Sequence, residues 1–448
     1  MADKKLTRQY IRRRRRRRRI TALIVLLLLV AAIVFGVSSF IKSLNKENCG
    51  SDISSELSSY NNTPKEPYKI ASAKVGSTGD LLIHSPILTS AKQSDGTYDF
   101  SGIFSSVKPY FEQFDLMTAN LEVTLAGDSR AYTGYPVFNC PDSLIDAAVN
   151  GGVDMFLTAN NHTYDTGIDG LMRTMKVLKE KSVPFIGTRQ SEQDSLYTVK
   201  DINGIKIGMV CYTYCTTASD GRKALNGNVL RSEAGPLVNT FDYNKLDEFY
   251  SEAESVITEM KNDGAEATII YLHWGNEYIR TPNTYQKAIA QKICDLGYDV
   301  IIGGHPHVIQ PIETLVSENG HETVCLYSMG NAISNQRKAL MDSDNYSGHT
   351  EDGLILGVTF DKYSDGKVVI SDLSVVPCWV DMKRISGKNQ YRIVPLDTEF
   401  LEDWDTYVLT GVSHAKASFN RTMKLVGEGL NAYRTSHGMS EVVTKVEP

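Results

Sequence analysis

Short apolar runs alternate with amphipathic segments along most of the chain beyond residue 68. The apolar runs are interpreted as strands and cover residues 70–76, 114–119, 153–158, 205–212, 267–272, 300–303 and 324–327. Apolar side chains at helical spacing predict helices at 143–150, 168–181, 243–261 and 283–296. Strands that alternate with helices in this way are typical of an α/β domain.

The last part of the chain has a different pattern. Two strand-like stretches between residues 354 and 380 flank the turn sequence Tyr-Ser-Asp-Gly at 363–366, which predicts antiparallel strands at the end of the sheet system. From residue 397 onward the pattern is helical. We therefore expect an α/β domain over residues 69–396 and a C-terminal helical extension over 397–448.

Residues 20–41 form an apolar run without any charged side chain. As a helix, this run would span the ~30 Å hydrocarbon core of a bilayer. Eight consecutive Arg at 12–19 precede it, and this positive charge predicts a cytoplasmic N-terminus and an extracellular C-terminal domain. A cleaved signal peptide is the alternative, but the run is longer than the ~7–15 residues of a typical apolar signal region. We therefore predict a single-pass plasma-membrane protein with a basic tip at 1–19, a transmembrane anchor at 20–41 and a polar linker at 42–68.

The net charge of −6 conceals two parts of opposite charge. Residues 1–19 hold nine Arg and two Lys against one Asp, a charge of +10, so the remaining chain carries −16. Domains that bind nucleic acid usually present a basic surface, so nucleic acid is not an expected partner. The basic tip is instead expected to orient the anchor and to contact anionic lipid in the membrane.

The seven Cys are scattered along the chain without the paired spacing of a metal site. Cys211 and Cys215 face the same side of one predicted strand, where they lie too far apart to form a disulfide. We expect buried free thiols, because a domain of this size does not depend on a disulfide framework.

Polar residues suited to metal binding or acid-base chemistry follow five of the predicted strands. In chain order these are Asp80 and His84, then Asn120 and Glu122, then Asn161, His162 and Asp165, then His273 and Glu277, and finally His305 and His307. Each residue taken alone has an ordinary structural explanation, such as a turn former, a helix cap or a hydrogen-bonded histidine. In an open α/β sheet, however, the carboxyl ends of the strands line one crevice, so we expect these side chains to converge.

The residue types in this set are those that bind divalent transition metals. Histidine, carboxylate and amide oxygen ligands together suit Mn, Fe, Zn or Co, and we expect two such ions per chain. His305 and His307 are separated by one residue and are well placed to serve two adjacent ions, which Glu122 could bridge. Two metal ions ~3.5–4 Å apart promote displacement at phosphorus and lower the pKa of a bound water.

Six motifs stand in a fixed order within residues 69–340. They are GSTGD, NLE, TANNHTYDTG, LHWGNEY, GGHPHVIQPIE and YSMGNAIS. In this order they resemble the motifs of the poly-γ-glutamate capsule-biosynthesis family (CapA-like), whose domain is related to calcineurin-like metallophosphoesterases. The resemblance implies a four-layer α/β/β/α sandwich of metallophosphoesterase type. It also implies an extracytoplasmic location in a bacterial envelope and a part in making, exporting or tethering an anionic capsule polymer.

The resemblance also implies roles for individual residues. The implied metal ligands are Asp80, Glu122, Asn161, His273, His305 and His307. His162 resembles the histidine that stabilises or protonates the leaving group, and Asp165 would orient it. The chain departs from the metallophosphoesterase pattern at two positions, because His84 lies four residues after Asp80 rather than two and Glu122 replaces the usual bridging Asp. Further candidates near the cleft are His84, Asn120, Glu277, Gln310 and Asn331. A structural role is an equal alternative for Glu277 and Gln310, and a structural turn is the favoured interpretation for Asn331.

Three functions remain open from the sequence. The first is a metal-dependent, phosphoesterase-like hydrolase that acts on an envelope phosphoester. The second is a non-catalytic accessory subunit that binds the capsule polymer or the membrane-bound subunits of a synthase. The third is an amide hydrolase that cleaves the polymer backbone with the same metals. A body with a charge of −16 repels poly-γ-glutamate at long range, so binding of this polymer requires a local basic cleft or bound cations.

Overall fold

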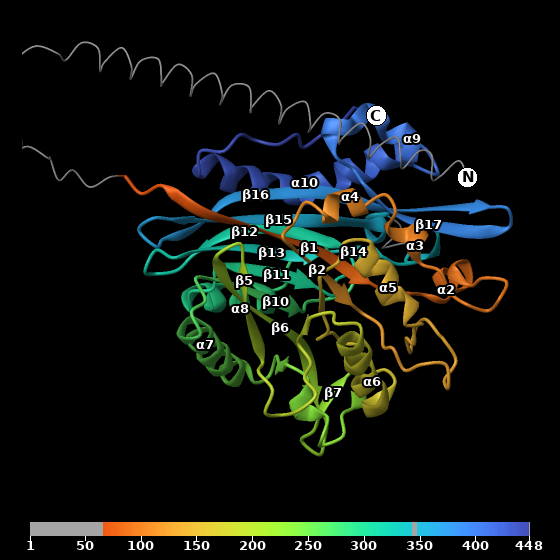
Figure 1. The fold of residues 1–448 in the computed structure, drawn as a ribbon, viewed down its shortest axis with the longest axis horizontal. Coiled ribbons are helices and arrows are strands. Elements are labelled where there is room, and N and C mark those ends of the chain that lie inside the picture. Colours follow the sequence, from red (N-terminus) through yellow and green to blue (C-terminus); the bar gives the residue numbers. More distant parts are fainter. Residues whose placement is uncertain (1–65, 343–346, 448) are drawn as a thin grey trace, which may run out of the picture. The chain divides into compact units, whose positions relative to one another are not determined.

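The computed structural model describes residues 66–342 and 347–447. The described residues from Lys69 onward form one compact unit built on two β-sheets (Figure 1). Among the described residues, no helix is both long enough and apolar enough to cross a bilayer. The predicted basic tip, the anchor at 20–41 and nearly all of the linker lie outside the described residues and stay predictions.

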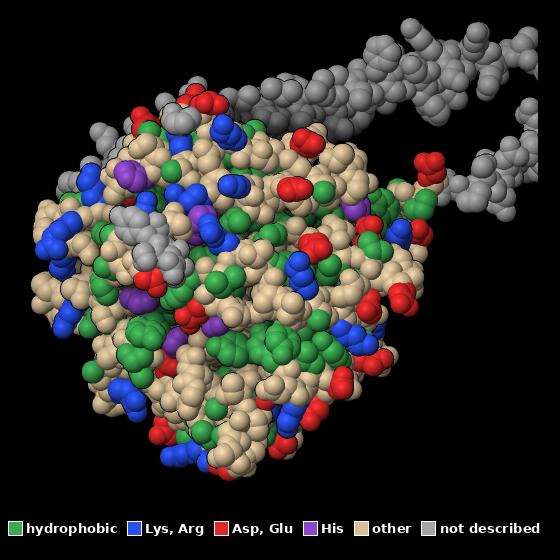
Figure 2. Space-filling view, turned by 180° about the vertical axis from the view of Figure 1, so that it is seen from behind, with side chains coloured by type: hydrophobic (Ala, Val, Ile, Leu, Met, Phe, Trp, Pro, Cys, Tyr) green, Lys and Arg blue, Asp and Glu red, His purple; other side chains and the backbone are tan. Residues whose placement is uncertain are grey.

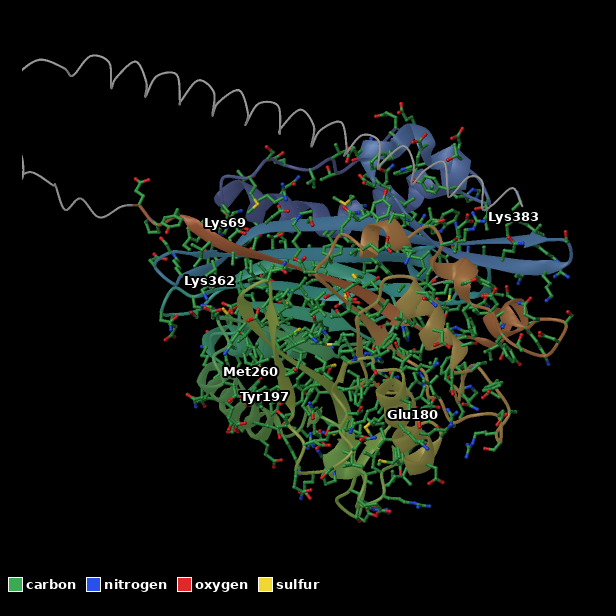
Figure 3. The ribbon with its side chains drawn as sticks, viewed as in Figure 1. Lys69, Glu180, Tyr197, Met260, Lys362 and Lys383 are labelled. Atoms are coloured by element: carbon green, nitrogen blue, oxygen red, sulfur yellow. The ribbon has the colours of Figure 1, made fainter. Side chains whose placement is uncertain are left out.

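The first sheet has the strand order β17-β16-β15-β1-β2-β3-β4, and β14 pairs with the end of β1. Strands β1 to β4 run parallel, whereas β15, β16 and β17 extend the sheet in antiparallel fashion. The start of β1 pairs with the end of β15, so Lys69 and Lys362 lie near each other (Figure 3). The bounds are β1 (Lys69–Leu81), β2 (Leu116–Leu121), β3 (Met155–Leu157), β4 (Phe185–Ile186), β14 (Asn331–Ile333), β15 (Asp352–Tyr363), β16 (Val368–Ile385) and β17 (Lys388–Pro395).

The second sheet has the strand order β12-β13-β11-β10-β6-β7-β8, and both β5 and β9 pair with β6. Its centre, formed by β6, β10, β11 and β13, is parallel. The bounds are β5 (Tyr197–Ile202), β6 (Ile205–Thr217), β7 (Lys223–Leu225), β8 (Asn228–Val229), β9 (Thr240–Asp242), β10 (Ala267–His273), β11 (Val300–Gly304), β12 (Ile309–Val316) and β13 (Glu322–Met329).

Helices connect and cover the strands (Figure 1). The α-helices are α2 (Ser85–Ala91), α3 (Ser101–Phe104), α4 (Lys108–Phe111), α5 (Ser143–Asn150), α6 (Gly167–Glu180), α7 (Leu246–Asn262), α8 (Thr284–Asp295), α9 (Trp404–Tyr407) and α10 (Val412–Ser436). Short 3₁₀ turns are η1 (Gly235–Leu237), η2 (Lys338–Leu340), η3 (His349–Glu351) and η4 (Thr398–Asp403).

Successive residues of the central strands face two different cores. On β10, Ile269 and Tyr271 pack with Val75 of β1 in the core between the sheets, whereas Ile270 and Leu272 pack under α7 and α8. A strand buried on both faces explains the nearly continuous apolar runs in the sequence. Each fully buried aliphatic side chain contributes roughly 1.5–3 kcal/mol, so this packing fixes the two sheets against each other.

Helix α10 is tied to the first sheet by a buried ion pair. It packs against β12, β15 and β16. Arg421 of α10 donates two hydrogen bonds of 2.7 Å to Asp352, the first residue of β15, and Ser418 donates a third at 2.6 Å. The C-terminal helix is therefore part of the same compact unit as the sheets.

The predicted α/β architecture is confirmed. Every predicted strand and helix after residue 68 overlaps an observed element of the same type, and the chain ends with antiparallel strands followed by helices. The six described Cys are all buried and free, as predicted.

Candidate metal centre

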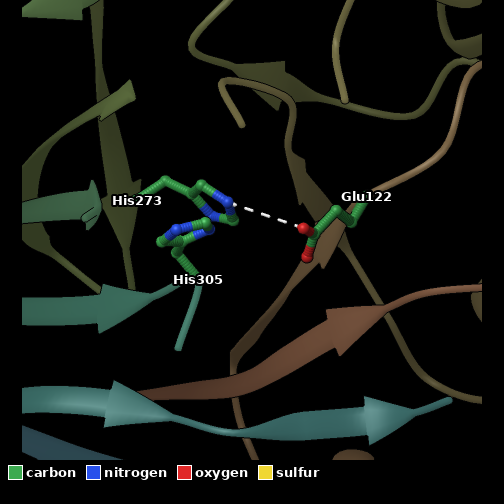
Figure 4. Close-up of side chains that lie close together, drawn as sticks. All are labelled: Glu122, His273 and His305. Atoms are coloured by element: carbon green, nitrogen blue, oxygen red, sulfur yellow. Dashed lines mark ion pairs between the residues drawn. The ribbon is translucent and has the colours of Figure 1, made fainter. Parts of the chain in front are cut away.

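Two groups of side chains that could hold a metal ion meet where the parallel strands of both sheets end. Glu122, His273 and His305 form the first group (Figure 4), and Asp80, Glu122 and His307 form the second. Within each group the ligand atoms all lie within 4.8 Å of one another. Glu122 belongs to both groups, and its Oε1 lies 3.5 Å from His273 Nε2 and 3.8 Å from His307 Nε2.

The chemistry of the two groups fits divalent cations. Glu122 Oε1 and His305 Nδ1 are buried and make no hydrogen bond with other described residues. Such orphaned polar atoms cost free energy unless a partner satisfies them, and a bound cation would do so. Burial holds the pKa of His273 and His305 well below the usual value, so both imidazoles are neutral and keep a lone pair for a metal. Burial and the nearby Asp80 raise the pKa of Glu122.

Two asparagines orient the carboxylates. Asn120 Nδ2 donates to Asp80 Oδ1 at 2.7 Å and to Glu122 Oε2 at 3.2 Å. The amide oxygen of Asn120 in turn accepts from Asn160 Nδ2 at 3.1 Å. In this geometry Asn120 positions the acidic ligands, and its own oxygen faces Asn160.

Asn161 extends the first group. Its Oδ1 lies 2.8 Å from His273 Nε2, the same ring nitrogen that faces Glu122. Its Nδ2 donates to Asn226 Oδ1 at 3.1 Å. The Asn161 oxygen is therefore placed beside the ligand atoms of the first group.

His162 and Asp165 form a buried pair at the edge of the centre. His162 Nδ1 lies 2.8 Å from Asp165 Oδ2, and the same carboxylate oxygen accepts from the backbone N–H of Phe138 at 2.8 Å. The Phe138 ring packs edge-on against the imidazole, with centroids 4.7 Å apart. Both contacts fix the orientation of the His162 ring.

The segment with His305 and His307 has a strained backbone. Both residues have positive φ, 97° and 56°, a region that residues other than glycine rarely adopt. Asn331 Nδ2 donates to the His307 carbonyl at 3.1 Å, and Tyr278 N donates to the Pro306 carbonyl at 2.7 Å. Strain of this kind persists where surrounding contacts hold it, and here it directs two imidazoles toward Glu122.

The remaining candidates from the sequence lie around the centre rather than in it. His84 lies outside both groups, and its Nδ1 accepts from Asn335 N at 3.2 Å. Gln310 accepts from Gln286 Nε2 at 2.7 Å and donates to the Ile279 carbonyl at 2.8 Å, so it supports a loop. Glu277 is exposed and lies close enough to Glu122 to interact electrostatically.

Sequence reasoning missed Asn226, which lies in the turn between β7 and β8. Asn226 has a positive φ of 46°, and its Nδ2 lies 3.4 Å from both ring nitrogens of His162. The Asn-Gly pair at 226–227 is a strong hairpin signal in the sequence. Only the fold brings this hairpin to the centre.

These features define a mixed α/β protein in which two sheets converge on a buried set of carboxylates and imidazoles that can hold divalent metal ions. The chain belongs to the family described as "Bacterial capsule synthesis protein PGA_cap", whose model matches residues 74–336. The predicted resemblance to the capsule-biosynthesis family is thereby confirmed.

Two curated relatives and one solved structure illustrate the similarity. The chain is similar to capsule biosynthesis protein CapA of Bacillus anthracis, at 25% identity over 270 residues that cover 58% of this chain and 59% of the relative. It is also similar to PGA biosynthesis protein CapA of Bacillus subtilis (strain 168), at 26% identity over 238 residues, 52% of this chain and 57% of the relative. The chain thus matches little more than half the length of these relatives. The calcineurin-like phosphoesterase YfkN from Bacillus subtilis aligns with a TM-score of 0.39 and 15% identity, covering 68% of this chain and 90% of that chain.

Proposed function

We propose that this chain is a membrane-anchored, extracytoplasmic capsule biosynthesis protein with a dinuclear metal hydrolase site in a four-layer sandwich of metallophosphoesterase type. The observation that carries the hydrolase proposal is the sharing of Glu122 between two ligand groups, which would suit two adjacent metal ions. The substrate class is a phosphoester or a polymer of the cell envelope. Family membership supports the role in capsule synthesis.

In this proposal the two ligand sets share Glu122 and differ in their other members. Glu122, His273 and His305, together with Asn161, would hold one divalent transition-metal ion. Asp80, Glu122 and His307 would hold the other. Bound ions of this type polarise a phosphoryl oxygen and activate water for hydrolysis.

In this proposal His162 is the general acid. Asp165 fixes the ring through Nδ1, so Nε2 is the nitrogen left to give a proton to a departing alkoxide. Burial of the pair under Phe138 keeps water away from the proton that is transferred.

The location and partners follow from the sequence and the family. The apolar run at 20–41 would hold the protein in the plasma membrane, with the domain from Lys69 onward outside the cell. An anionic capsule polymer and membrane-bound synthase subunits are the proposed partners. The relatives carry the names capsule biosynthesis protein and PGA biosynthesis protein, which supports this assignment.

The test combines metal analysis with a hydrolysis assay on the full-length protein in detergent. Wild type should retain about two transition-metal ions per chain and hydrolyse p-nitrophenyl phosphate. His305→Ala should lose bound metal and most of the activity, whereas His414→Ala, on the exposed face of α10, should retain both. If wild type holds no metal, hydrolyses nothing and still supports capsule formation in cells, the non-catalytic accessory role replaces the hydrolase. Release of free amines from poly-γ-glutamate would instead indicate an amide hydrolase.

A further inference from the structure

Three tyrosines continue the metal centre outward along the second sheet. The Tyr214 ring, in the last part of β6, packs against the His305 ring with centroids 4.8 Å apart. Tyr243 follows β9 and stacks on Tyr214 at 6.1 Å, and Tyr285 in the first turn of α8 packs on Tyr243 at 5.1 Å. We call Tyr214, Tyr243 and Tyr285 the tyrosine row.

The tyrosine row is accessible and only partly used by the fold. Tyr214 and Tyr243 are half-buried, and Tyr285 is 49% exposed. On the face drawn in Figure 2, hydrophobic side chains gather beside histidines. The Tyr243 hydroxyl accepts from Gly275 N at 2.8 Å, which fixes its ring. The hydroxyls of Tyr214 and Tyr285 make no hydrogen bond with other residues that the structure describes.

Polar groups that suit sugar hydroxyls accompany the row. The exposed Glu277 lies close enough to Tyr214 to interact electrostatically. The exposed Asn276 lies next to it in the chain, and its side-chain oxygen accepts from Asn283 Nδ2, at the start of α8, at 2.6 Å. An aromatic row with carboxylate and amide groups offers flat apolar faces and hydrogen-bond acceptors together.

We propose that the tyrosine row binds the neutral sugar portion of a phosphorylated saccharide whose phosphate lies at the metal centre. The sugar rings would stack on the phenol rings, and their hydroxyls would reach Glu277, Asn276 and the free phenol hydroxyls. Placing the phosphate at the metal centre rests on the proposed function. Binding of the sugar by the tyrosine row does not depend on hydrolysis.

Two other ligand classes fit the row less well. Poly-γ-glutamate has no ring to stack, and its carboxylates would face Glu277 as like charges. A single nucleobase would cover only one of three successive phenol rings, whereas a saccharide of several rings would contact the whole row. The row therefore favours a neutral chain of rings.

Kinetics of the full-length protein test the proposal. The measured quantity is the kcat/KM for maltotriose 1-phosphate, a substrate of three sugar rings, divided by that for glycerol 2-phosphate. Because an aromatic stacking contact corresponds to roughly a threefold to tenfold change, Tyr285→Ala should lower this ratio by about that factor. The control is Tyr68→Ala, an exposed tyrosine directly before β1 and at the opposite end of this strand from Asp80, which should keep the wild-type ratio.

A binding measurement separates this proposal from the proposed function. Titration calorimetry with triacetylchitotriose, which has no phosphate, should show binding to wild type and to Tyr68→Ala and weaker binding to Tyr285→Ala. If the enzyme hydrolyses no phosphoester but this pattern is found, the proposed function fails and the saccharide site stands. An unchanged ratio in Tyr285→Ala, a larger loss with 5′-AMP than with the sugar phosphate, or the absence of trisaccharide binding would each overturn the saccharide site.

Discussion

At the scale of single residues, the centre depends on pairs in which one side chain fixes another. Asn120 holds Asp80 and Glu122, Asn331 holds the backbone of His307, and Asp165 holds His162. Buried hydrogen bonds of this kind orient the groups that act on a substrate.

The His162 and Asp165 pair gives the first prediction. Asp165→Asn should lower kcat by roughly 10²-fold for an alkyl phosphate, whose alkoxide needs a proton to leave. The loss should be much smaller for p-nitrophenyl phosphate, because its leaving group departs without help. Steady-state kinetics with both substrates give the comparison, and the metal content of the variant should equal that of wild type. Equal losses with both substrates would show that Asp165 acts on the fold rather than on the proton.

Asn226 gives a second prediction. Asn226→Gly keeps the positive φ of the turn but removes the amide that contacts Asn161 and His162. Loss of one or two hydrogen bonds predicts a fall in kcat of roughly twofold to tenfold with an unchanged Tm. Asn228→Ala, on the exposed strand β8 of the same hairpin, is the control and should behave as wild type. A fall in Tm without a fall in kcat would contradict a positioning role.

His84 gives a prediction for pH and stability. Burial lowers its pKa from 6.5 to about 4, so between these values the unfolded chain binds a proton that the folded chain excludes. The contribution of His84 to stability is complete above pH 6.5 and is lost as the pH falls toward 4, by about 2 kcal/mol between ~6.5 and ~5. When the free energy of unfolding is measured in urea between pH ~6.5 and ~5, it should fall less for His84→Gln than for wild type. His414→Gln, an exposed control, should show the same pH dependence as wild type. If the free energy of unfolding changes with pH equally in all three proteins, the loss of stability does not come from His84.

At the scale of elements, the carboxyl ends of strands deliver the site. Residues from β1, β2, β10 and β11 reach one place because these parallel strands end at the same edge of their sheets. The sequence predicted this convergence from apolar runs followed by polar residues. It did not predict the β7–β8 hairpin at the site or the attachment of α10, since both depend on contacts between residues far apart in the chain.

The buried ion pair of α10 gives an element-scale prediction. Arg421→Ala leaves the fully buried Asp352 without its charge partner, and should reduce the free energy of unfolding by about 3 kcal/mol. Lys424→Ala, on the exposed side of the same helix, should change it by less than about 0.5 kcal/mol. Urea unfolding of the full-length proteins provides the values. Equal stability of the two variants would show that the pair does not hold the helix.

At the scale of the whole molecule, charge separates the tip from the rest of the chain. Residues 1–19 carry +10, whereas the −16 of the remaining chain predicts that this part of the protein and poly-γ-glutamate repel each other at long range. Any binding of this polymer by residues 69–448, which lack the basic tip, should therefore strengthen as ionic strength rises toward ~0.15 M, because salt screens the repulsion. Fluorescence anisotropy of labelled polymer measures this dependence. Weakening with salt would reveal a local basic cleft.

The sequence by itself determined the order of strands and helices, the buried thiols and the positions where ligand chemistry follows a strand. These properties are local, since hydrophobic period, turn residues and short motifs are encoded within a few neighbouring positions. Only the tertiary structure decided which side chains meet. Three features of the site join residues that are distant in the chain. They are the sharing of Glu122 between two groups, the contact of Asn226 with His162, and the row of rings from His305 to Tyr285. Their geometry depends on how two sheets pack, which no local pattern contains.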